Sequence, residues 1–281
     1  MPYKKALNLY NMKKLFFILF TLLRRGIYVL LAFFDRMVKR EQKVFILSYH
    51  SIASDGWRFS IDPHVIKKQI DYLQKHYAMI TLKDLELFLA GKKTMQKPSV
   101  ILTFDDGYKD ILTIKDYLVT KKIRPALFIL SDRERANWQE LGTKRQFLNK
   151  EEIRSLIKLD WEIGCHSATH DNLSTIHKDM LEKEVVQAKK TLEKELQMPI
   201  NYFAYPRGKY SPKVRTVIKA AKYSMAFTMD DGFITTQSDA YTLPRVGIDR
   251  SHTFAEFKAA FSPSVVTFRR IVKTSWIGRY L

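Results

Sequence analysis

Val100-Ile-Leu-Thr-Phe-Asp-Asp-Gly-Tyr108 is the stretch of sequence from which the fold can be predicted. Its β-branched and apolar residues follow Pro98 and predict a strand that is buried on both faces. Gly107 then permits a sharp turn, so that Asp105 and Asp106 stand at the carboxyl end of the strand. Parallel α/β sheets and barrels place their chemistry at this end of their strands.

The two adjacent carboxylates have two interpretations. One aspartate could simply cap a helix whose pattern begins near Tyr108. Two like charges side by side repel each other, however, and favour a cation or a shared proton between them. If a cation lies between the two carboxylates, the pair indicates that further metal ligands occur elsewhere in the sequence.

A second motif, Trp161-Glu-Ile-Gly-Cys-His-Ser-Ala-Thr-His170, supplies such ligands. A short apolar run ends at His166, and His170 follows at a spacing that places both imidazoles on one side of a helical turn or tight loop. Two neutral imidazoles and one carboxylate can hold a metal and leave positions open for water and substrate. A single histidine here would more often be a buried hydrogen-bonding residue. The pair, combined with Asp-Asp-Gly, predicts a metal site.

Thr103-Phe-Asp-Asp-Gly107 and His166-Ser-Ala-Thr-His170 resemble the first two motifs of the polysaccharide deacetylase family (NodB-homology domain, carbohydrate esterase family 4). The resemblance runs from about Val44 to Phe261. The Tyr49-His50 pair is similar to the opening of the branch that deacetylates poly-N-acetylglucosamine. The resemblance implies an α/β fold, a distorted (β/α)7 barrel of the NodB-homology type preceded here by an N-terminal amphipathic helix. It also implies a metal-dependent deacetylase.

The resemblance carries roles for individual residues. Asp106, His166 and His170 would hold a divalent cation, with zinc the expected ion. That cation would lower the pKa of water and polarise the acetyl carbonyl. Asp105 would be the general base, and the nearby cation would favour its ionised form. The backbone N–H of Arg207, in a Pro-Arg-Gly turn, would donate to the oxyanion.

The sequence departs from the family in two motifs. Position 204 is alanine where the family usually has an arginine that orients the base. Arg245 resembles the arginine that replaces it in the poly-N-acetylglucosamine branch, and a surface salt bridge is its alternative role. The usual general-acid histidine of a late Leu-x-His motif is absent. His50 is preferred to His252 for that role, although it could instead hydrogen-bond the backbone at the barrel rim.

Strands and helices alternate along the chain, which by itself favours a barrel or a parallel sheet. Residues 131–148 fit neither period and predict a long loop. Cys165 is expected to pack as a small buried residue and not to ligate the metal. Helices are predicted at residues 62–77, 84–89, 108–121, 177–197 and 211–221, and another helix is predicted to start at residue 149. Strands are predicted at residues 43–49, 78–81, 125–130, 224–228 and 241–248, and also within 201–208, where a Pro-Arg-Gly turn closes the strand.

Composition indicates one large domain with an anionic partner. A chain of 281 residues with 46% hydrophobic content can bury one sizeable core. The formal net charge is +19, and such an excess favours nucleic acid, an acidic glycan or anionic lipid as a partner. No nucleic-acid-binding motif is visible, so a membrane surface is expected instead. The expected division is a basic, membrane-associating segment (residues 1–43) and a deacetylase domain (residues 44–281).

The N-terminal segment has several interpretations. A signal peptide lacks its small-residue cleavage site. A transmembrane helix would hold Arg24 and Arg25 near its middle, at a cost of about 2.5–3.5 kcal/mol each. Its helical phase instead predicts a helix lying in the plane of the bilayer interface, with a helix docked on the barrel as the alternative. The polar side carries Lys14, Thr21, Arg25, Tyr28, Asp35, Arg36 and Lys39, and the apolar side Phe16, Leu19, Phe20, Leu23, Ile27, Leu30, Leu31 and Phe34.

The expected function is removal of N-acetyl groups from amino sugars of a bacterial surface polysaccharide or its lipid-linked precursor. The protein would be peripheral or monotopic at the bacterial inner membrane, on a face that the sequence does not identify. An O-acetyl carbohydrate esterase could use the same residues, because the two reactions differ only in the leaving group. A non-catalytic glycan-binding barrel is the third alternative, against which the complete set of two aspartates and two histidines argues. The sequence indicates no oligomeric state.

Overall fold

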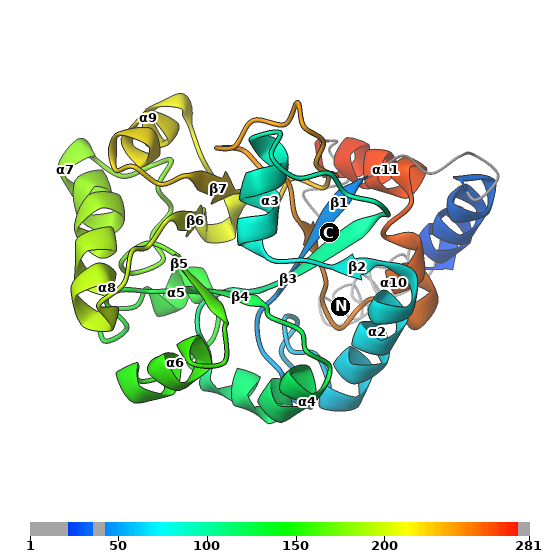
Figure 1. Ribbon diagram of the computed structural model, residues 1–281, viewed down its shortest axis with the longest axis horizontal. Helices are drawn as coiled ribbons and strands as arrows, with labels where there is room; N and C mark the ends of the chain where they lie inside the picture. The colour runs from blue at the N-terminus through cyan, green and yellow to red at the C-terminus, as the bar shows by residue number, and fades with distance from the viewer. Residues whose placement is uncertain (1–21, 36–42, 275–281) are drawn as a thin grey trace, which may run out of the picture. The chain divides into compact units, whose positions relative to one another are not determined.

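The computed structural model describes residues 22–35 and 43–274, and the chain divides into two compact units (Figure 1). The larger unit comprises residues 40–251 and the smaller unit residues 1–39 and 252–281. The predicted division into residues 1–43 and 44–281 stays a prediction.

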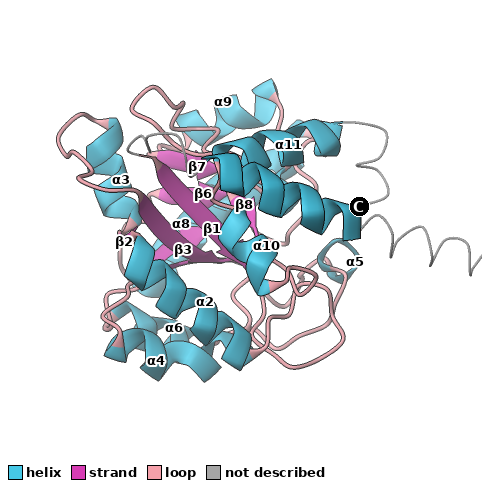
Figure 2. Ribbon diagram, turned by 90° about the vertical axis from the view of Figure 1, so that its right-hand side faces the viewer, coloured by secondary structure: helices cyan, strands magenta, loops and turns pink. Residues whose placement is uncertain are grey.

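One sheet forms the centre of the larger unit. Seven of its strands follow the order β7-β6-β5-β4-β3-β1-β8, and β2 pairs with β3 outside this path. These pairings are parallel, so helical crossovers return the chain to the same end of the sheet each time. The predicted distorted (β/α)7 barrel is confirmed as a curled parallel sheet with helices around it (Figure 2). The strands are β1 (Val44–Tyr49), β2 (Ala78–Met79), β3 (Ser99–Phe104), β4 (Ala126–Ile129), β5 (Glu162–Cys165), β6 (Tyr202–Ala204), β7 (Met225–Phe227) and β8 (Val246–Gly247).

Several helices of the larger unit begin at side-chain caps that the sequence provides. Asp62 accepts a hydrogen bond from the backbone N–H of His64 at the start of the first of them. Asn149 and Glu152 form a reciprocal capping box, which confirms the helix start predicted there. The helices are α2 (Pro63–His76), α3 (Leu82–Leu89), the 3₁₀ helix η1 (Lys109–Ile114), α4 (Lys115–Thr120), α5 (Trp138–Leu141), α6 (Lys150–Ile157), α7 (Lys178–Glu182), the π-helix η2 (Lys183–Gln187), α8 (Ala188–Leu196), the 3₁₀ turn η3 (Pro206–Gly208) and α9 (Pro212–Ala220).

Three predicted elements differ in the structure. The helix expected at residues 108–121 opens with the 3₁₀ turn η1, where Asp110 accepts hydrogen bonds from Ser51 Oγ and the N–H of Ile52. The loop expected at 131–148 contains the one-turn helix α5, because Asn137 caps it. The strand expected at 241–248 is reduced to β8, since Pro244 has no N–H to donate to a ladder.

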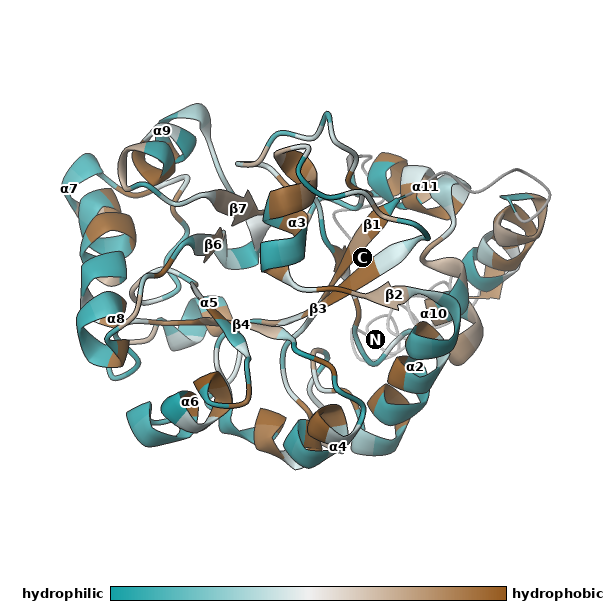
Figure 3. Ribbon diagram, in the orientation of Figure 1, coloured by the Kyte–Doolittle hydropathy of each residue, from teal (hydrophilic) through white to brown (hydrophobic). Residues whose placement is uncertain are grey.

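The core lies on both faces of the sheet. Every residue of β1 and β3 is buried, as the apolar character of both strands predicts. The colouring by hydropathy shows brown strands and helices that are teal on parts of their surface (Figure 3). Inside the curl, side chains from β1, β3, β4, β6 and β7 pack with α3 in one cluster. Burial of each large side chain contributes roughly 1.5–3 kcal/mol to stability.

The smaller unit joins a helix over residues 22–35 to α10 (Phe254–Ala259) and α11 (Pro263–Thr274). Tyr28 is buried in a cluster with Ala259 and Val265. Arg24 Nε donates to Glu256 Oε1 at 3.0 Å, and Asp35 Oδ2 accepts from the N–H of Ser264 at 2.8 Å. The helix thus contacts protein through the side that carries its polar residues.

Much of the apolar side of this helix is exposed, although Leu31 is partly buried against the Tyr28 cluster. Leu23, Leu30 and Phe34, which the sequence places on that side, have exposed fractions of 62%, 57% and 56%. Within the described part of the chain, each helix is too short or too polar to span a bilayer. The remainder of the predicted amphipathic segment, residues 1–21 and 36–42, lies outside the described residues.

Candidate active site

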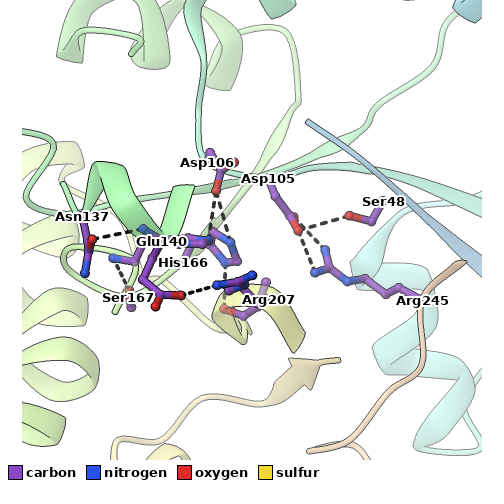
Figure 4. Close-up of polar contacts among 11 residues, drawn as sticks. Ser48, Asp105, Asp106, Asn137, Glu140, His166, Ser167, Arg207 and Arg245 are labelled. Atoms are coloured by element: carbon purple, nitrogen blue, oxygen red, sulfur yellow. Dashed lines mark hydrogen bonds and ion pairs between the residues drawn. The ribbon is translucent and has the colours of Figure 1, made fainter. Parts of the chain in front are cut away.

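Asp106, His166 and His170 come together at the carboxyl ends of β3 and β5. Figure 4 labels Asp106 and His166 of this cluster. Asp106 Oδ1 lies 3.4 Å from His166 Nε2 and 3.5 Å from His170 Nε2. Ligand atoms held at about 2.1 Å from a tetrahedral zinc ion are about 3.4 Å apart. The observed spacing therefore fits three ligands around one cation, as the two sequence motifs predict.

One polar atom of this cluster, Asp106 Oδ1, is buried, and no donor among the described residues reaches it with hydrogen-bond geometry. A carbonyl can only accept, so the 2.8 Å contact between His166 Nδ1 and the Ala204 carbonyl places a proton on Nδ1, and the neutral imidazole then carries its lone pair on Nε2. A buried carboxylate oxygen without a donor is costly unless a cation satisfies it. The residues present therefore fit a divalent metal.

The pKa values of the three groups reflect burial and their neighbours. Burial raises the pKa of Asp106, but the adjacent imidazole of His166 and the charge of His170 lower it overall, well below its usual range. Burial lowers the pKa of His170 to about 4 in spite of the nearby Asp106, so this imidazole is neutral at pH 7. Burial also opposes protonation of His166, but the nearby carboxylates of Asp105 and Asp106 raise its pKa overall. Asp106 and His170 are thus already in the protonation states that bind metal.

Unusual backbone conformations place these ligands. Asp106 has φ 68°, Ser167 φ 71° and His170 φ 72°, all in the left-handed region. Gly107 has φ 79°, and a Cβ there would lie 2.8 Å from Cγ2 of Ile129. Such strain is costly and persists where surrounding structure enforces it, which is common at functional sites.

Asp105, the predicted base, is held by Arg245. The guanidinium donates from Nη1 to Oδ1 at 2.7 Å and from Nη2 to Oδ2 at 2.8 Å, and Ser48 Oγ donates to Oδ2 at 3.1 Å. Arg245 is 0% exposed, so the alternative role of a surface salt bridge is wrong. Burial raises the pKa of Asp105, but the charges of Arg245 and His166 and the hydrogen bonds from Arg245 together lower it overall.

His50 directly follows β1, on the same edge of the sheet as the two carboxylates. Its ring centroid lies 5.0 Å from that of Phe59 and 6.5 Å from that of Trp57. Its charge is near enough to lower the pKa of both Asp105 and Asp106. Its Nδ1 is buried and has no hydrogen-bond partner in the described part of the chain. His50 therefore offers an unpaired imidazole nitrogen on the edge of the sheet where the two carboxylates lie.

Arg207 lies in the turn η3, at the carboxyl end of β6, with φ 54°. Its Nη1 donates to Oε2 of Glu140 at 2.6 Å, so the ion pair joins this turn to α5 (Figure 4).

Cys165 is buried, and burial raises the pKa of its thiol to about 12, so it is a neutral core residue as predicted. His252 belongs to the smaller unit, whereas the cluster is in the larger one.

Four residues of the site are not predicted from the sequence. Ser48 could have been found as a polar residue within an otherwise apolar strand. Ser167, whose Oγ accepts from the N–H of His170 at 3.0 Å, stood inside the histidine motif. Asn137 and Glu140 were hidden because their segment appeared to be a structureless loop. Only contacts distant in sequence identify these last two.

Comparison with known proteins agrees with this geometry. Residues 92–226 match the family model described as "Polysaccharide deacetylase". The poly-beta-1,6-N-acetyl-D-glucosamine N-deacetylase of Staphylococcus aureus (strain MRSA252) is 28% identical over 235 residues, which cover 74% of this chain and 79% of that protein.

Two solved structures share the fold. IcaB from Ammonifex degensii is 20% identical with a TM-score of 0.66, over 82% of this chain and 98% of that one. The Streptococcus pyogenes deacetylase PplD, in complex with acetate, is 19% identical with a TM-score of 0.67, over 78% of this chain and 98% of that one. In its barrel, its two motifs and its match to the family model over residues 92–226, this chain is similar to polysaccharide deacetylases.

Proposed function

We propose that this protein is a metal-dependent hydrolase that removes N-acetyl groups from amino sugars of a bacterial surface polysaccharide or its lipid-linked precursor. The observation that carries the proposal is the arrangement of Asp105, buried and bound to Arg245, beside the Asp106, His166 and His170 cluster. The named Staphylococcus aureus relative acts on a polymer of this chemistry, which supports the substrate class.

Hydrolysis of an acetamide needs an activated water, stabilisation of the oxyanion and a proton for the departing amine. Asp106, His166 and His170 would hold a divalent cation, which we propose is zinc, and it would supply Lewis-acid chemistry toward water and the acetyl carbonyl. Asp105, ionised and oriented by Arg245, accepts the proton of the attacking water. The backbone N–H of Arg207 donates to the oxyanion, and His50 gives a proton to the amine.

The decisive experiment measures acetate release alongside metal content of the purified protein. We expect release from N-acetylglucosamine oligomers, about one zinc per chain, and loss of release in Asp105→Asn with the zinc retained. Asp116→Asn is the matched control, because its side chain is 93% exposed. Release only from acetylated xylan would instead identify an O-acetyl esterase, and glycan binding without any release would identify a binding barrel.

We further propose that the exposed side of the helix at residues 22–35 lies on an anionic bilayer, which makes the enzyme a peripheral or monotopic protein of the bacterial inner membrane. Leu23, Leu30 and Phe34 offer apolar side chains to the acyl boundary. The sequence of the smaller unit contains thirteen Lys or Arg against two acidic residues. Such an excess attracts anionic headgroups at about 1 kcal/mol for each cation near the surface.

Flotation with vesicles tests this placement. The full chain should float with vesicles that contain phosphatidylglycerol and float less with vesicles of pure phosphatidylcholine. A variant in which Leu23, Leu30 and Phe34 are all changed to serine should float poorly with both kinds of vesicle. Val119→Ser, an exposed apolar residue on α4, is the control and should float as the wild type does. Equal flotation of the triple variant and the wild type would refute the proposed contact.

A further inference from the structure

A carboxylate outside the cluster holds the histidine loop, residues 166–170. Glu184 Oε2 accepts hydrogen bonds from the backbone N–H groups of Ala168 and Thr169, each at 3.0 Å. Its Oε1 accepts from the hydroxyl of Thr169 at 2.9 Å. Glu184 is only 2% exposed, so both oxygens of a buried carboxylate are used to bind this loop.

The helix that carries Glu184 is widened at this point. Glu184 belongs to the π-helix η2, which stands between α7 and α8 in one continuous helical segment. A π turn accommodates an extra residue, and such turns are frequent at functional sites. Val185 and Ala188 are buried in the same segment. The widened turn thus combines a carboxylate directed at the loop with apolar residues that keep the helix packed.

The loop needs such support because of its conformation. Ser167 and His170 both have positive φ, which is unfavourable for residues with a Cβ. The carbonyl groups of residues 167–169 accept hydrogen bonds from the backbone N–H groups of Ser131, Asp132 and Asn137. The N–H groups of Ala168 and Thr169 donate to Glu184 and that of His170 donates to Ser167 Oγ, while that of His166 donates to the carbonyl of Ile129 at 2.8 Å. The loop is therefore held through its N–H groups by Glu184 of η2 and through its carbonyl groups by the segment at residues 131–137.

We propose that Glu184 is a positioning residue that fixes His170 toward Asp106 and thereby sets the metal affinity of the site. The inference rests on metal binding at the cluster that the proposed function requires, but it is independent of the substrate. Loss of an outer partner of a metal ligand typically weakens affinity or activity 10- to 100-fold. We expect a change of this size when the carboxylate is removed.

The test uses three variants of the full chain. Glu184→Ala removes all three hydrogen bonds to the loop. Glu184→Gln keeps one oxygen for the two N–H groups and offers an amide N–H to the Thr169 hydroxyl, which can rotate to accept it. Glu182→Ala removes an exposed carboxylate two residues away and controls for the loss of charge. Zinc affinity is measured by competition with a chelator, and the ligand geometry by the visible absorption of the cobalt-loaded protein.

Hydrogen–deuterium exchange of residues 166–171 in the metal-free protein gives a readout that needs no metal. The proposal predicts that Glu184→Ala binds zinc 10- to 100-fold more weakly, with an altered cobalt spectrum and faster exchange in this loop. Glu184→Gln should remain within a few-fold of the wild type, and Glu182→Ala should match it.

Wild-type zinc affinity and loop exchange in Glu184→Ala would overturn the proposal. So would equal weakening in Glu184→Ala and Glu182→Ala. If Glu184→Ala does not fold, Thr169→Val takes its place, because it removes one of the three donors to Glu184. A loss of zinc affinity smaller than 10- to 100-fold would support the proposal, and an unchanged affinity would overturn it. A wild-type protein that binds no metal would refute the proposed hydrolase, while loop exchange would still report on Glu184.

Discussion

Asp105 and Arg245 are 140 residues apart in the sequence and form a buried, bidentate ion pair, with N–O distances of 2.7 and 2.8 Å. The guanidinium comes from the residue just before β8, and the carboxylate follows β3; both elements pair with β1. Because Arg245 also donates to the carbonyl of Thr228 at 3.1 Å, its plane is anchored on two sides. The pair therefore both orients the proposed base and keeps it ionised.

Arg245→Gln should raise the pKa of Asp105, because the positive charge that lowers it is lost. The base is then protonated at a higher pH, so the acid limb of the profile of kcat/KM against pH should move upward. Arg135→Gln, whose wild-type side chain is 84% exposed, should leave the profile unchanged. An unmoved acid limb in Arg245→Gln would show that Asp105 does not govern it.

The same pair makes stability depend on pH. The pKa of Asp105 is depressed in the folded protein, so its contribution is present above the unfolded value, about 4, and is lost as pH falls through the folded value. Arg245→Gln should lower the free energy of unfolding at pH 7 by about 3–5 kcal/mol, the usual cost of breaking a buried pair. Chemical denaturation at pH 7 and pH 3 measures both effects, and the variant should lose less stability than the wild type between them.

Removal of the metal should abolish acetate release and lower the melting temperature. A ligand that binds only the folded state stabilises it, by about 2.7 kcal/mol at a concentration 100 times its Kd. Zinc added after dialysis against a chelator should restore both properties in the wild type. It should restore neither in Asp106→Ala, which lacks one of the three ligands. Full recovery of this variant would place the metal elsewhere.

Gly107→Ala should destabilise the fold and displace the ligand beside it. The new Cβ would meet Ile129 Cγ2 at 2.8 Å on a backbone that already has positive φ. Gly91→Ala is a matched control, since Gly91 has φ 69° but no atom within 4 Å of the added Cβ. Gly91→Ala should cost about 1–2 kcal/mol from backbone strain alone, and Gly107→Ala about 1–3 kcal/mol more from overpacking. Equal losses in thermal or chemical denaturation would contradict the importance of the contact.

His50→Gln separates a general acid from a structural residue. Loss of a general acid typically reduces the rate 10²- to 10⁴-fold when the leaving group needs a proton. We expect that loss in kcat for acetamido sugars and a much smaller one for 4-nitrophenyl acetate, whose leaving group departs without protonation. His64→Gln, an exposed residue at the start of α2, is the control. Parallel losses on both substrates would assign His50 a role in folding or metal binding.

The sequence by itself determined the parallel sheet and identified Asp106, His166 and His170, which cluster as candidate metal ligands. Apolar runs ending in Asp105-Asp106 and in His166 identify strands and the edge at which their polar residues meet. The cap at Asn149 likewise placed a helix start correctly. These features depend on neighbours in the chain, whose propensities and spacing are visible in the sequence.

Only the tertiary structure decided how Asp105, Arg245 and Glu184 are used. A buried salt bridge and an exposed one have the same sequence signature, and burial separates them because it depends on strands distant in the chain. The N-terminal helix shows the same limit. Helical phase separated its polar and apolar sides, but packing within the smaller unit placed the polar side, with Tyr28, against protein. Such choices arise from contacts between distant segments, which periodicity and local propensity do not encode.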